Sequence, residues 1–457
     1  MNKIILRRAI LAAAISTASS GTMAAGFFLN ETSTSGLGRA FAAENTIGDN
    51  AAILARNPAG SALFDTITIS GGVTYVNPEI DAEGDISYFV DTPFGVVEVG
   101  PFHEEDNDYA SSAFVPNAYL AVPIDDCWSF GLAMYTNYGL ETDFDSDSLV
   151  LNIADKTELL TVNIAPSVAY NYQDIFSIGL AVNFLYADAE LKTRVPDDFP
   201  LDAVLPFPLS GAQILKLEGD DWDVSWSIGA LWNITPSTRL GLSYHADFDP
   251  KLDGDVSSDL LPSPLAPFDD VDGNLTLDLP DYWELGLYHK FNQNWGIALG
   301  ATYTDWDDFQ RLEAFLPGQG APFNPLPLKE ENFESGWRFS IGGEYYPCEE
   351  VTWRIGYAYD EGAARDGLNP TEETANALGL PITWRTLSIP DTDRHWVTFG
   401  GTYEFDQHLS VDGGLAYLWG DDERIQEFTA APVPTYYNGG TTNIAAWLAG
   451  VSLNYRF

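Results

Sequence analysis

The last seven residues, Val451-Ser452-Leu453-Asn454-Tyr455-Arg456-Phe457, alternate strictly between apolar and polar side chains, and the chain ends on an aromatic ring. Successive side chains of a β-strand point to opposite faces, so this stretch presents one continuous apolar face. Such a face can lie against lipid or against the core of a soluble sandwich. The rest of the chain has to decide between these two environments.

The opposite end of the chain has the pattern of a secretory targeting segment. Lys3, Arg7 and Arg8 form a basic start, a short apolar run follows, and small residues lead to Ala24. We therefore expect residues 1–24 to be a signal peptide that is cleaved after Ala24. No later stretch approaches the roughly 18 consecutive apolar residues of a membrane helix, so any crossing of a membrane must use strands.

The composition favours an exported, acidic surface protein. The chain has 67 acidic and 21 basic residues, a net charge of −46, and 13% aromatic residues. Phosphates would be repelled by this charge, so we expect no nucleic-acid partner. Cys127 and Cys348 lie beside turns that the strand map places on opposite sides of a ring, which predicts that they form no disulfide.

Short and long connections alternate along the whole chain. Six tight polar turns are flanked by alternating segments, as hairpins require. They lie at residues 124–126, 171–174, 233–237, 292–294, 347–350 and 406–408. Seven longer Pro- and Asp-rich stretches lie between them, at residues 78–112, 141–158, 195–221, 256–272, 314–328, 362–387 and 426–439.

This alternation is typical of the periplasmic turns and extracellular loops of outer-membrane barrels, and 13 connections join 14 antiparallel strands. The predicted strands carry one apolar face; Ile178, Leu180 and Val182, for example, alternate with Gly179 and Ala181. We therefore predict an all-β, 14-stranded transmembrane barrel in the bacterial outer membrane. A soluble jelly roll is the alternative, but it would not explain the signal peptide and the loop pattern together.

A 14-stranded barrel leaves a lumen that something has to fill, and the residues before the first strand are the candidates. This region does not alternate and contains Ala-rich stretches that favour short helices. Asp49 and Asn57 can each cap one helix, and Pro58 suits a first helical position. We therefore predict a signal peptide at 1–24, a helical hatch at 25–64 that plugs the lumen, and the barrel at 65–457.

An ordered set of short motifs resembles the long-chain fatty acid transporter (FadL) family of outer-membrane proteins. No single motif is decisive, but together they run through the whole mature chain. They are Ala25-Gly26-Phe27, Ser35-Gly36-Leu37-Gly38-Arg39-Ala40-Phe41, Arg56-Asn57-Pro58-Ala59, Val115-Pro116-Asn117, Asn137-Tyr138-Gly139-Leu140, Leu275-Thr276-Leu277-Asp278-Leu279-Pro280, Ser388-Ile389-Pro390-Asp391 and Asp393-Arg394. The resemblance implies a 14-stranded barrel, plugged by a hatch, that imports hydrophobic substrates.

The resemblance also implies a binding pocket, formed by Phe27, Lys329 and Asp360. A further basic residue of the family aligns near Thr193, which makes Arg194 a candidate, although an offset of one residue turns a strand side chain to the other face. The alternatives are an exposed loop-edge lysine for Lys329 and a surface position for Arg194.

Two further sites follow from the resemblance. Asn57-Pro58-Ala59 resembles the family's hatch motif at the constriction, and it can equally be a simple helix cap. Tyr138-Gly139-Leu140 matches a kinked strand that opens a lateral hole in the wall, whereas the plain reading of Gly139 is a strand-end glycine.

The expected function is transport of long-chain fatty acids through a hydrophobic lumenal pocket, hatch rearrangement and lateral exit. The alternatives are a channel for neutral or aromatic hydrocarbons and, less favoured, a general porin. We expect no enzyme, no cofactor and no metal. The alternative to the absence of an enzyme is a hydrolase whose serine and histidine meet only in the folded chain. The alternative to the absence of a metal is Ca²⁺ binding by residues 102–108. The expected partners are outer-membrane lipid, lipopolysaccharide and the barrel assembly machinery, which would read the strand ending at Phe457, with the chain itself a monomer.

Overall fold

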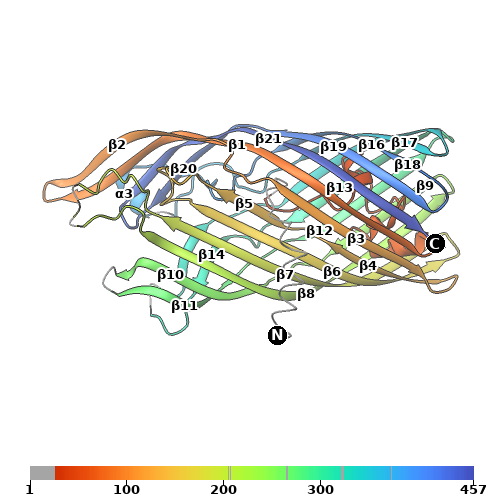
Figure 1. Cartoon of the computed structure of the whole chain (residues 1–457), viewed down its shortest axis with the longest axis horizontal. Helices are drawn as coiled ribbons and strands as arrows, with labels where there is room; N and C mark the ends of the chain where they lie inside the picture. Colours follow the sequence, from red (N-terminus) through yellow and green to blue (C-terminus); the bar gives the residue numbers. More distant parts are fainter. Residues whose placement is uncertain (1–25, 204, 206, 264–265, 321–323, 372) are drawn as a thin grey trace.

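The computed structural model describes residues 26–457 apart from 204, 206, 264–265, 321–323 and 372. The expected signal peptide, residues 1–24, therefore lies outside the described residues. The strands of the protein form a single closed antiparallel sheet (Figure 1). Among the described residues, no helix has both the length and the apolar character needed to cross a bilayer.

The strands are β1 (Thr68–Thr92), β2 (Gly95–Asp106), β3 (Ala113–Pro123), β4 (Trp128–Tyr135), β5 (Gly139–Asp143), β6 (Lys156–Tyr172), β7 (Phe176–Arg194), β8 (Gln213–Thr235), β9 (Thr238–His245), β10 (Lys251–Ser263), β11 (Ala266–Thr276), β12 (Asp281–Lys290), β13 (Trp295–Asp305), β14 (Arg311–Phe315), β15 (Leu326–Glu330), β16 (Gly336–Cys348), β17 (Val351–Asp360), β18 (Arg394–Glu404), β19 (Leu409–Gly420), β20 (Glu423–Thr429) and β21 (Thr435–Arg456).

These segments occupy 14 positions around the barrel, as the loop alternation predicts. Seven positions hold one continuous strand: β1, β6, β7, β8, β17, β18 and β21. The other seven are interrupted, each holding two segments in sequence, as β4 and β5 do. The ring closes where β1 pairs with β21, from Thr68 opposite Arg456 to Tyr88 opposite Thr435.

The six short turns lie where the sequence places them, all at the end of the barrel that holds the C-terminus (Figure 1). The opposite end differs from the prediction. Residues 78–112 and 256–272, expected to be loops, lie largely in the hairpins β1–β2 and β10–β11. Beyond the bilayer neither face of a strand has to be apolar, so these acidic extensions lack the alternation that identifies a lipid-facing strand. A short helix, α3 (Glu373–Leu378), also lies at this end.

The apolar faces of the strands point outward. On β7 the Leu180 side chain is 48% exposed, whereas Asn183 is 1% exposed. The terminal strand behaves in the same way, because Leu453 is exposed and Asn454 is buried. This is the inversion of a soluble protein that a lipid-facing barrel requires. Cys127 and Cys348 are both exposed and free, on different turns.

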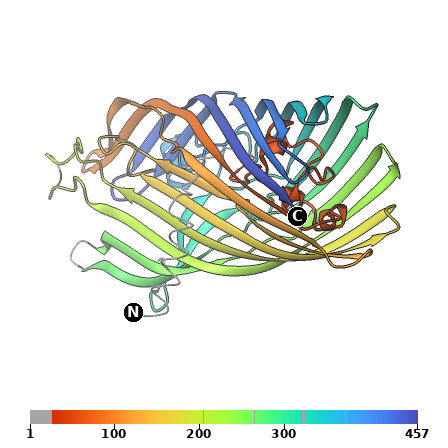
Figure 2. The same cartoon turned by 45° about the vertical axis from the view of Figure 1, so that its right-hand side comes forward.

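Residues 26–64, which we call the N-terminal segment, lie inside the barrel (Figure 2). The segment contains one turn of α-helix, α2 (Thr34–Leu37), and two 3₁₀ helices, η1 (Ala51–Ala55) and η2 (Pro58–Leu63). Asn57 caps η2 with Pro58 at its first position, as expected. The cap of η1 is Asn50 rather than the expected Asp49, because the Asp49 carboxylate is bound to Arg39 instead.

Glycines of the wall face the N-terminal segment at close range. A Cβ atom on Gly229 would lie 1.9 Å from Asn57 Oδ1, and one on Gly356 would lie 2.2 Å from the carbonyl carbon of Arg39. Only glycine permits backbone to approach so closely. We call seven of these glycines the glycine belt: Gly179, Gly229, Gly241, Gly286, Gly342, Gly356 and Gly400.

Candidate functional site

A buried aromatic cluster surrounds Phe27 at the start of the N-terminal segment. The Phe27 ring centroid lies 4.7 Å from that of Trp306 and 5.1 Å from that of Phe309, in edge-to-face geometry. Phe333 and Tyr138 complete the cluster, and all five side chains are at most 2% exposed. Edge-to-face rings pack well without polar partners. The cluster is therefore an apolar site that the chain fills with its own residue.

The barrel wall is interrupted beside this cluster. The pairing of β3 with β4 stops at Ala118 opposite Met134, and the chain leaves the sheet before β5 begins at Gly139. The N-terminal segment pairs with this interruption: the Gly139 N–H donates to the Phe27 carbonyl at 3.0 Å, and the Leu29 N–H donates to the Asn137 carbonyl at 2.9 Å. Tyr138 and Gly139 thus contact Phe27 directly, while Leu140, also buried, belongs to the same apolar cluster.

A buried arginine lies next to the N-terminal segment. Arg394 Nη2 donates to Asp391 Oδ1 at 2.8 Å, and the same oxygen accepts the Gly26 N–H at 3.1 Å. The Nε and Nη1 atoms of Arg394 have no hydrogen-bond partner among the residues that the structure describes. A guanidinium with buried, unused donors is suited to binding a carboxylate.

Asp360 lies opposite Arg394 on the neighbouring strand and opposite Arg338 on the other side. Its Oδ2 atom is 3.9 Å from Arg338 Nε, and all three side chains are buried. The structure therefore brings Asp360 and Phe27 to the same region: Asp360 is the cross-strand neighbour of Arg394, and Arg394 is linked through Asp391 to Gly26.

Lys329 lies next to a larger apolar cluster that includes the aromatic cluster, but its ammonium does not contact the rings. Its neighbours on β15, Leu326 and Leu328, pack against this larger cluster. The Lys329 ammonium instead donates to the Glu427 carboxylate and, at 3.2 Å, to the Ile153 carbonyl. Lys329 is thus a partly buried, paired lysine rather than an exposed loop-edge one.

Arg194, at the end of β7, makes contacts of a different kind. Its guanidinium lies 3.4 Å from the Asp155 carboxylate and 3.5 Å from that of Asp197, and it donates to the Ser146 carbonyl at 3.3 Å. These contacts join loops at the end of the barrel opposite the C-terminus, so the described contacts do not bring Arg194 together with Phe27.

The Asn57-Pro58-Ala59 motif fixes the N-terminal segment to the wall. Asn57 Oδ1 accepts the Ala59 N–H at 2.9 Å, while Asn57 Nδ2 donates to the Asn45 carbonyl at 2.8 Å and the Ala230 carbonyl on β8 at 3.2 Å. The cap and the docking role are therefore combined in one side chain.

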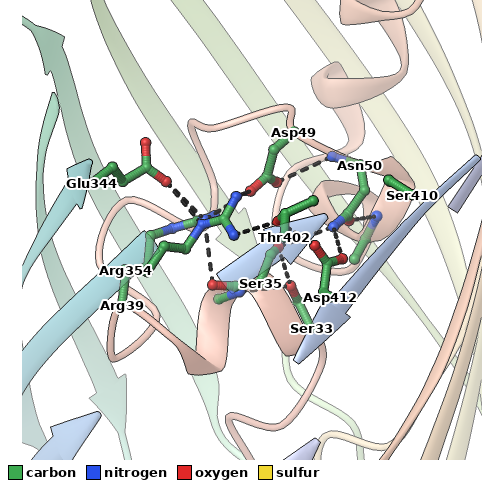
Figure 3. A network of polar contacts seen from close by, with 12 residues as sticks. Ser33, Ser35, Arg39, Asp49, Asn50, Glu344, Arg354, Thr402, Ser410 and Asp412 are labelled. Carbon is green, nitrogen blue, oxygen red and sulfur yellow. Dashed lines mark hydrogen bonds and ion pairs between the residues drawn. The ribbon is translucent and has the colours of Figure 1, made fainter. Parts of the chain in front are cut away.

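A network of ion pairs holds the middle of the N-terminal segment (Figure 3). Arg39 lies 2.7 Å from Glu44, 2.9 Å from Asp49 and 3.4 Å from Glu344 of β16. Arg354 of β17 also binds Asp49 at 3.0 Å and Glu344 at 3.1 Å. Burial works against the charge of Arg39, but the three carboxylates outweigh it and raise the pKa of Arg39. Burial opposes ionisation of Asp49 as well, yet the two guanidiniums hold its pKa below the ordinary value.

A second polar group lies nearer the aromatic cluster. Arg56 pairs with Glu284 of β12 at 3.2 Å, and the Arg56 carbonyl contacts His245 Nε2 at 3.0 Å. Glu31, 2% exposed, lies in the field of Arg56 and Arg338. Burial outweighs both guanidiniums and raises the pKa of Glu31 to about 7.

Within the described ranges, no group of three or more His, Cys, Asp or Glu residues is arranged to hold a metal ion. In the acidic run at 102–108, His103 faces Asp85 across the β1–β2 pair, with Nδ1 3.3 Å from a carboxylate oxygen.

Several residues of the site were not singled out from the sequence. Arg394 lies in the Asp393-Arg394 motif, so a basic residue inside an otherwise apolar and acidic region was a usable signal. Trp306, Phe309 and Phe333 lie between strands, and the aromatic residues there give no periodic pattern. Only the folded chain brings these rings together around Phe27.

Comparison with known proteins gives consistent matches over the whole chain. The family described as "Outer membrane protein transport protein (OMPP1/FadL/TodX)" matches residues 15–457. The "Long-chain fatty acid transport protein" of Escherichia coli (strain K12) is 31% identical over 483 residues, covering 100% of this chain and 99% of that protein. "Outer membrane protein P1" of Haemophilus influenzae is 31% identical over 477 residues, covering 98% and 99%.

Solved structures share the fold. A Pseudomonas aeruginosa FadL homologue has a TM-score of 0.78 and 23% identity, covering 95% of this chain and 100% of that one. The Pseudomonas putida toluene transporter TodX has a TM-score of 0.59 and 18% identity, covering 89% and 94%. At these identities the likeness extends to the barrel architecture and carries no assignment of substrate.

Proposed function

The chain belongs to the OMPP1/FadL/TodX family of outer-membrane transport proteins, and we propose that its own substrates are long-chain fatty acids. A fatty acid enters from the extracellular end, and its tail takes the place of Phe27 in the aromatic cluster. It then leaves sideways through the interruption at Gly139. The protein acts as a monomeric transporter in outer-membrane lipid and performs no covalent chemistry.

The observation that carries this proposal is the direct contact between the aromatic cluster and the interrupted wall. The Phe27 side chain is buried among aromatic rings with 1% of its surface exposed, and the Phe27 carbonyl accepts a hydrogen bond from the Gly139 N–H at the interruption. Each methylene of an acyl chain gains about 0.8 kcal/mol on leaving water, so a long tail can compete with one phenylalanine ring. The ligand shifts the N-terminal segment only because it prefers the displaced state, in which Phe27 has left the cluster.

The headgroup has a matching site beside the tail. A buried carboxylate needs compensating donors, since burying a bare charge is prohibitive. Arg394 offers Nε and Nη1, which are unpaired among the described residues, and its Nη2 is linked through Asp391 to Gly26. A carboxylate bound at these unused donors would share the guanidinium charge with Asp391, and repulsion between the two carboxylates would loosen Asp391 and the Gly26 N–H that it binds. Binding and displacement are thereby coupled.

The proposal is tested by filling the interruption with Gly139→Trp. We expect the variant to reach the outer membrane and bind oleate, while oleate uptake falls to background in cells that lack their own uptake protein. Gly413→Trp is the matched control, because a Cβ atom on this exposed glycine meets nothing within 4 Å. Normal oleate uptake by Gly139→Trp at normal surface level would disprove lateral exit.

A neutral hydrocarbon substrate is the second candidate, favoured by one observation. Lys329 is bound to Glu427 and Arg394 to Asp391, so neither cation is free of a carboxylate. Arg394→Met separates the two functions: a fatty acid transporter loses oleate binding, whereas a hydrocarbon channel keeps its affinity for a neutral probe such as toluene. Conductance of the purified wild-type protein in a planar bilayer would instead favour a general porin.

A further inference from the structure

Lys329 is held in a complete carboxylate-binding site. Its ammonium donates to one oxygen of Glu427, and the Leu387 N–H donates to the other oxygen at 3.0 Å. Both charged side chains are 11% exposed. An ammonium and a backbone N–H that converge on one carboxylate form a strong, oriented site. In this structure the carboxylate is supplied by the protein itself.

A second acid lies beside this pair. Glu331 is 1% exposed; its Oε2 atom accepts from Thr386 at 3.5 Å, and its Oε1 atom has no hydrogen-bond partner among the described residues. Burial raises the pKa of Glu331 to about 8; Lys329 works against this rise, while Glu427 and Glu330 add to it. Two buried acids therefore lie in the field of one partly buried lysine.

This polar group lies at the boundary between two apolar clusters. On one side are Phe27 and its neighbours, which Leu328 and Ile389 join. On the other side is an extracellular apolar cluster that includes Ile153 and Leu387, the two residues whose backbones bind Lys329 and Glu427. The ion pair thus contacts residues of both clusters, where a hydrophobic ligand moving from the extracellular cluster to the aromatic cluster would meet it.

We propose that Glu427 is a built-in competitor for the substrate's headgroup: its carboxylate occupies a second carboxylate site, formed by Lys329 and the Leu387 N–H, which an incoming fatty acid meets before Arg394 and from which it has to displace Glu427. This inference rests on the proposed function. Glu427 and Glu331 together make the boundary selective, because an ionised ligand adds a further negative charge around one ammonium. A neutral ligand of the same length meets no such opposition.

The consequence is a dependence on ligand charge that the two acids control separately. Exchange of Glu427 for a ligand carboxylate leaves Glu427 buried without its counter-ion, which is costly. Above pH 8 Glu331 also ionises, so the affinity for an ionised ligand falls further as the pH rises. The affinity for a neutral ligand stays constant over the same range, because no charge is added.

The test compares two probes of equal chain length, oleate and oleyl alcohol, on the purified full-length protein. Glu427→Gln keeps the size of the side chain and removes the competing charge. We expect this variant to bind oleate roughly tenfold more tightly than wild type at pH 7, which corresponds to about 1.4 kcal/mol of binding free energy. We expect its affinity for oleyl alcohol to stay within about twofold of wild type. Glu331→Gln should abolish the loss of oleate affinity between pH 7 and pH 9.

Glu158→Gln is the matched control, because Glu158 forms a comparable pair with Lys156 at 2.6 Å on β6 and should leave both affinities unchanged. Weaker oleate binding by Glu427→Gln, or an equal change for both probes, would overturn the proposal. A wild type that binds oleyl alcohol while neither it nor Glu427→Gln binds oleate would instead overturn the fatty acid function.

Discussion

The two halves of the N-terminal segment are attached to the same barrel by different forces. The middle of the segment, from Arg39 to Asn57, is fixed by ion pairs and by direct backbone contact with the glycine belt. Its beginning, around Phe27, is held by aromatic packing and by a few hydrogen bonds, two of them to the interrupted strand. A hydrophobic ligand can replicate ring packing but cannot replace a network of guanidiniums and carboxylates. We therefore propose that the middle of the segment seals the lumen and that its beginning is the part that a substrate displaces.

The largest effect is expected where the wall and the segment touch. Gly356→Val places a side chain where a single Cβ atom would already lie 2.2 Å from the backbone of Arg39. Overpacking costs about 1–3 kcal/mol even where neighbours can move, and backbone here cannot. We expect the segment to leave its site and the purified variant to conduct ions steadily in planar bilayers. Gly413→Val is the control, and a non-conducting Gly356→Val barrel would show that the belt does not determine the seal.

The next effect concerns the ion network. Arg39→Met removes the cation that Glu44, Asp49 and Glu344 share and leaves buried carboxylates without it. Breaking a buried pair in this way costs about 3–5 kcal/mol. We expect frequent conductance bursts and cleavage of residues 30–60 by added protease. Arg365→Met removes a pair that is roughly half exposed and should change neither readout, since such pairs contribute at most about 1 kcal/mol.

A smaller effect is expected from the pH dependence with which the N-terminal segment docks in the barrel, because the buried Glu31 carboxyl group titrates near neutral pH. The pKa of Glu31 is raised by burial from 4.5 to about 7. The docked segment therefore binds this proton more tightly than the undocked one, and docking loses stability as the pH rises from 4.5 through 7. Relative to Glu31→Gln, we expect the wild type to lose ~2–3 kcal/mol between pH 5 and pH 8.5. Hydrogen exchange of residues 30–60, compared at each pH, measures this difference; parallel curves would contradict it.

The smallest effect is expected at the displaceable end. Phe27→Ala opens space in the aromatic cluster without touching the ion network. We expect oleate to bind up to roughly tenfold more tightly, since the ring no longer competes for its site. The variant should remain non-conducting, because the seal lies elsewhere. Conductance in Phe27→Ala would erase the distinction between the two halves, and unchanged affinity would show that Phe27 does not occupy the ligand's site.

The sequence predicts the barrel better than its contents. Lipid imposes period-two alternation on strands such as β7, so strand number, turns and the outward face were all readable from the chain. The hairpins beyond the bilayer were not predicted as strands, because lipid imposes no alternation on their acidic residues. The sequence also did not predict that Asn50, rather than Asp49, caps η1. The Asp49 carboxylate binds Arg39, ten residues away, and Arg354 of the wall, and neither contact can be read from the local sequence.

The candidate site was readable only in part. Phe27 and Asp360 were reached through the family resemblance, and the structure places them in one region of the lumen. Arg194 and the partners of Lys329 could not be judged from the sequence, because the orientation of a side chain at the end of a strand is set by loops far along the chain. Glu427, which lies 98 residues from Lys329, has no local signal at all.

At the seam where the barrel closes, the last and the first strand both bind the N-terminal segment, which links closure of the barrel to filling of its lumen. Arg456, the penultimate residue, donates from Nη2 to the Asp49 carbonyl at 2.9 Å. The Ala51 N–H, two residues further on, donates to Ser70 on β1 at 3.0 Å. The first and last strands thus grip the same short stretch of the N-terminal segment from both sides of the seam. A ring that closes around an empty lumen leaves these groups unmatched, so a correctly filled barrel is also the one that closes most firmly.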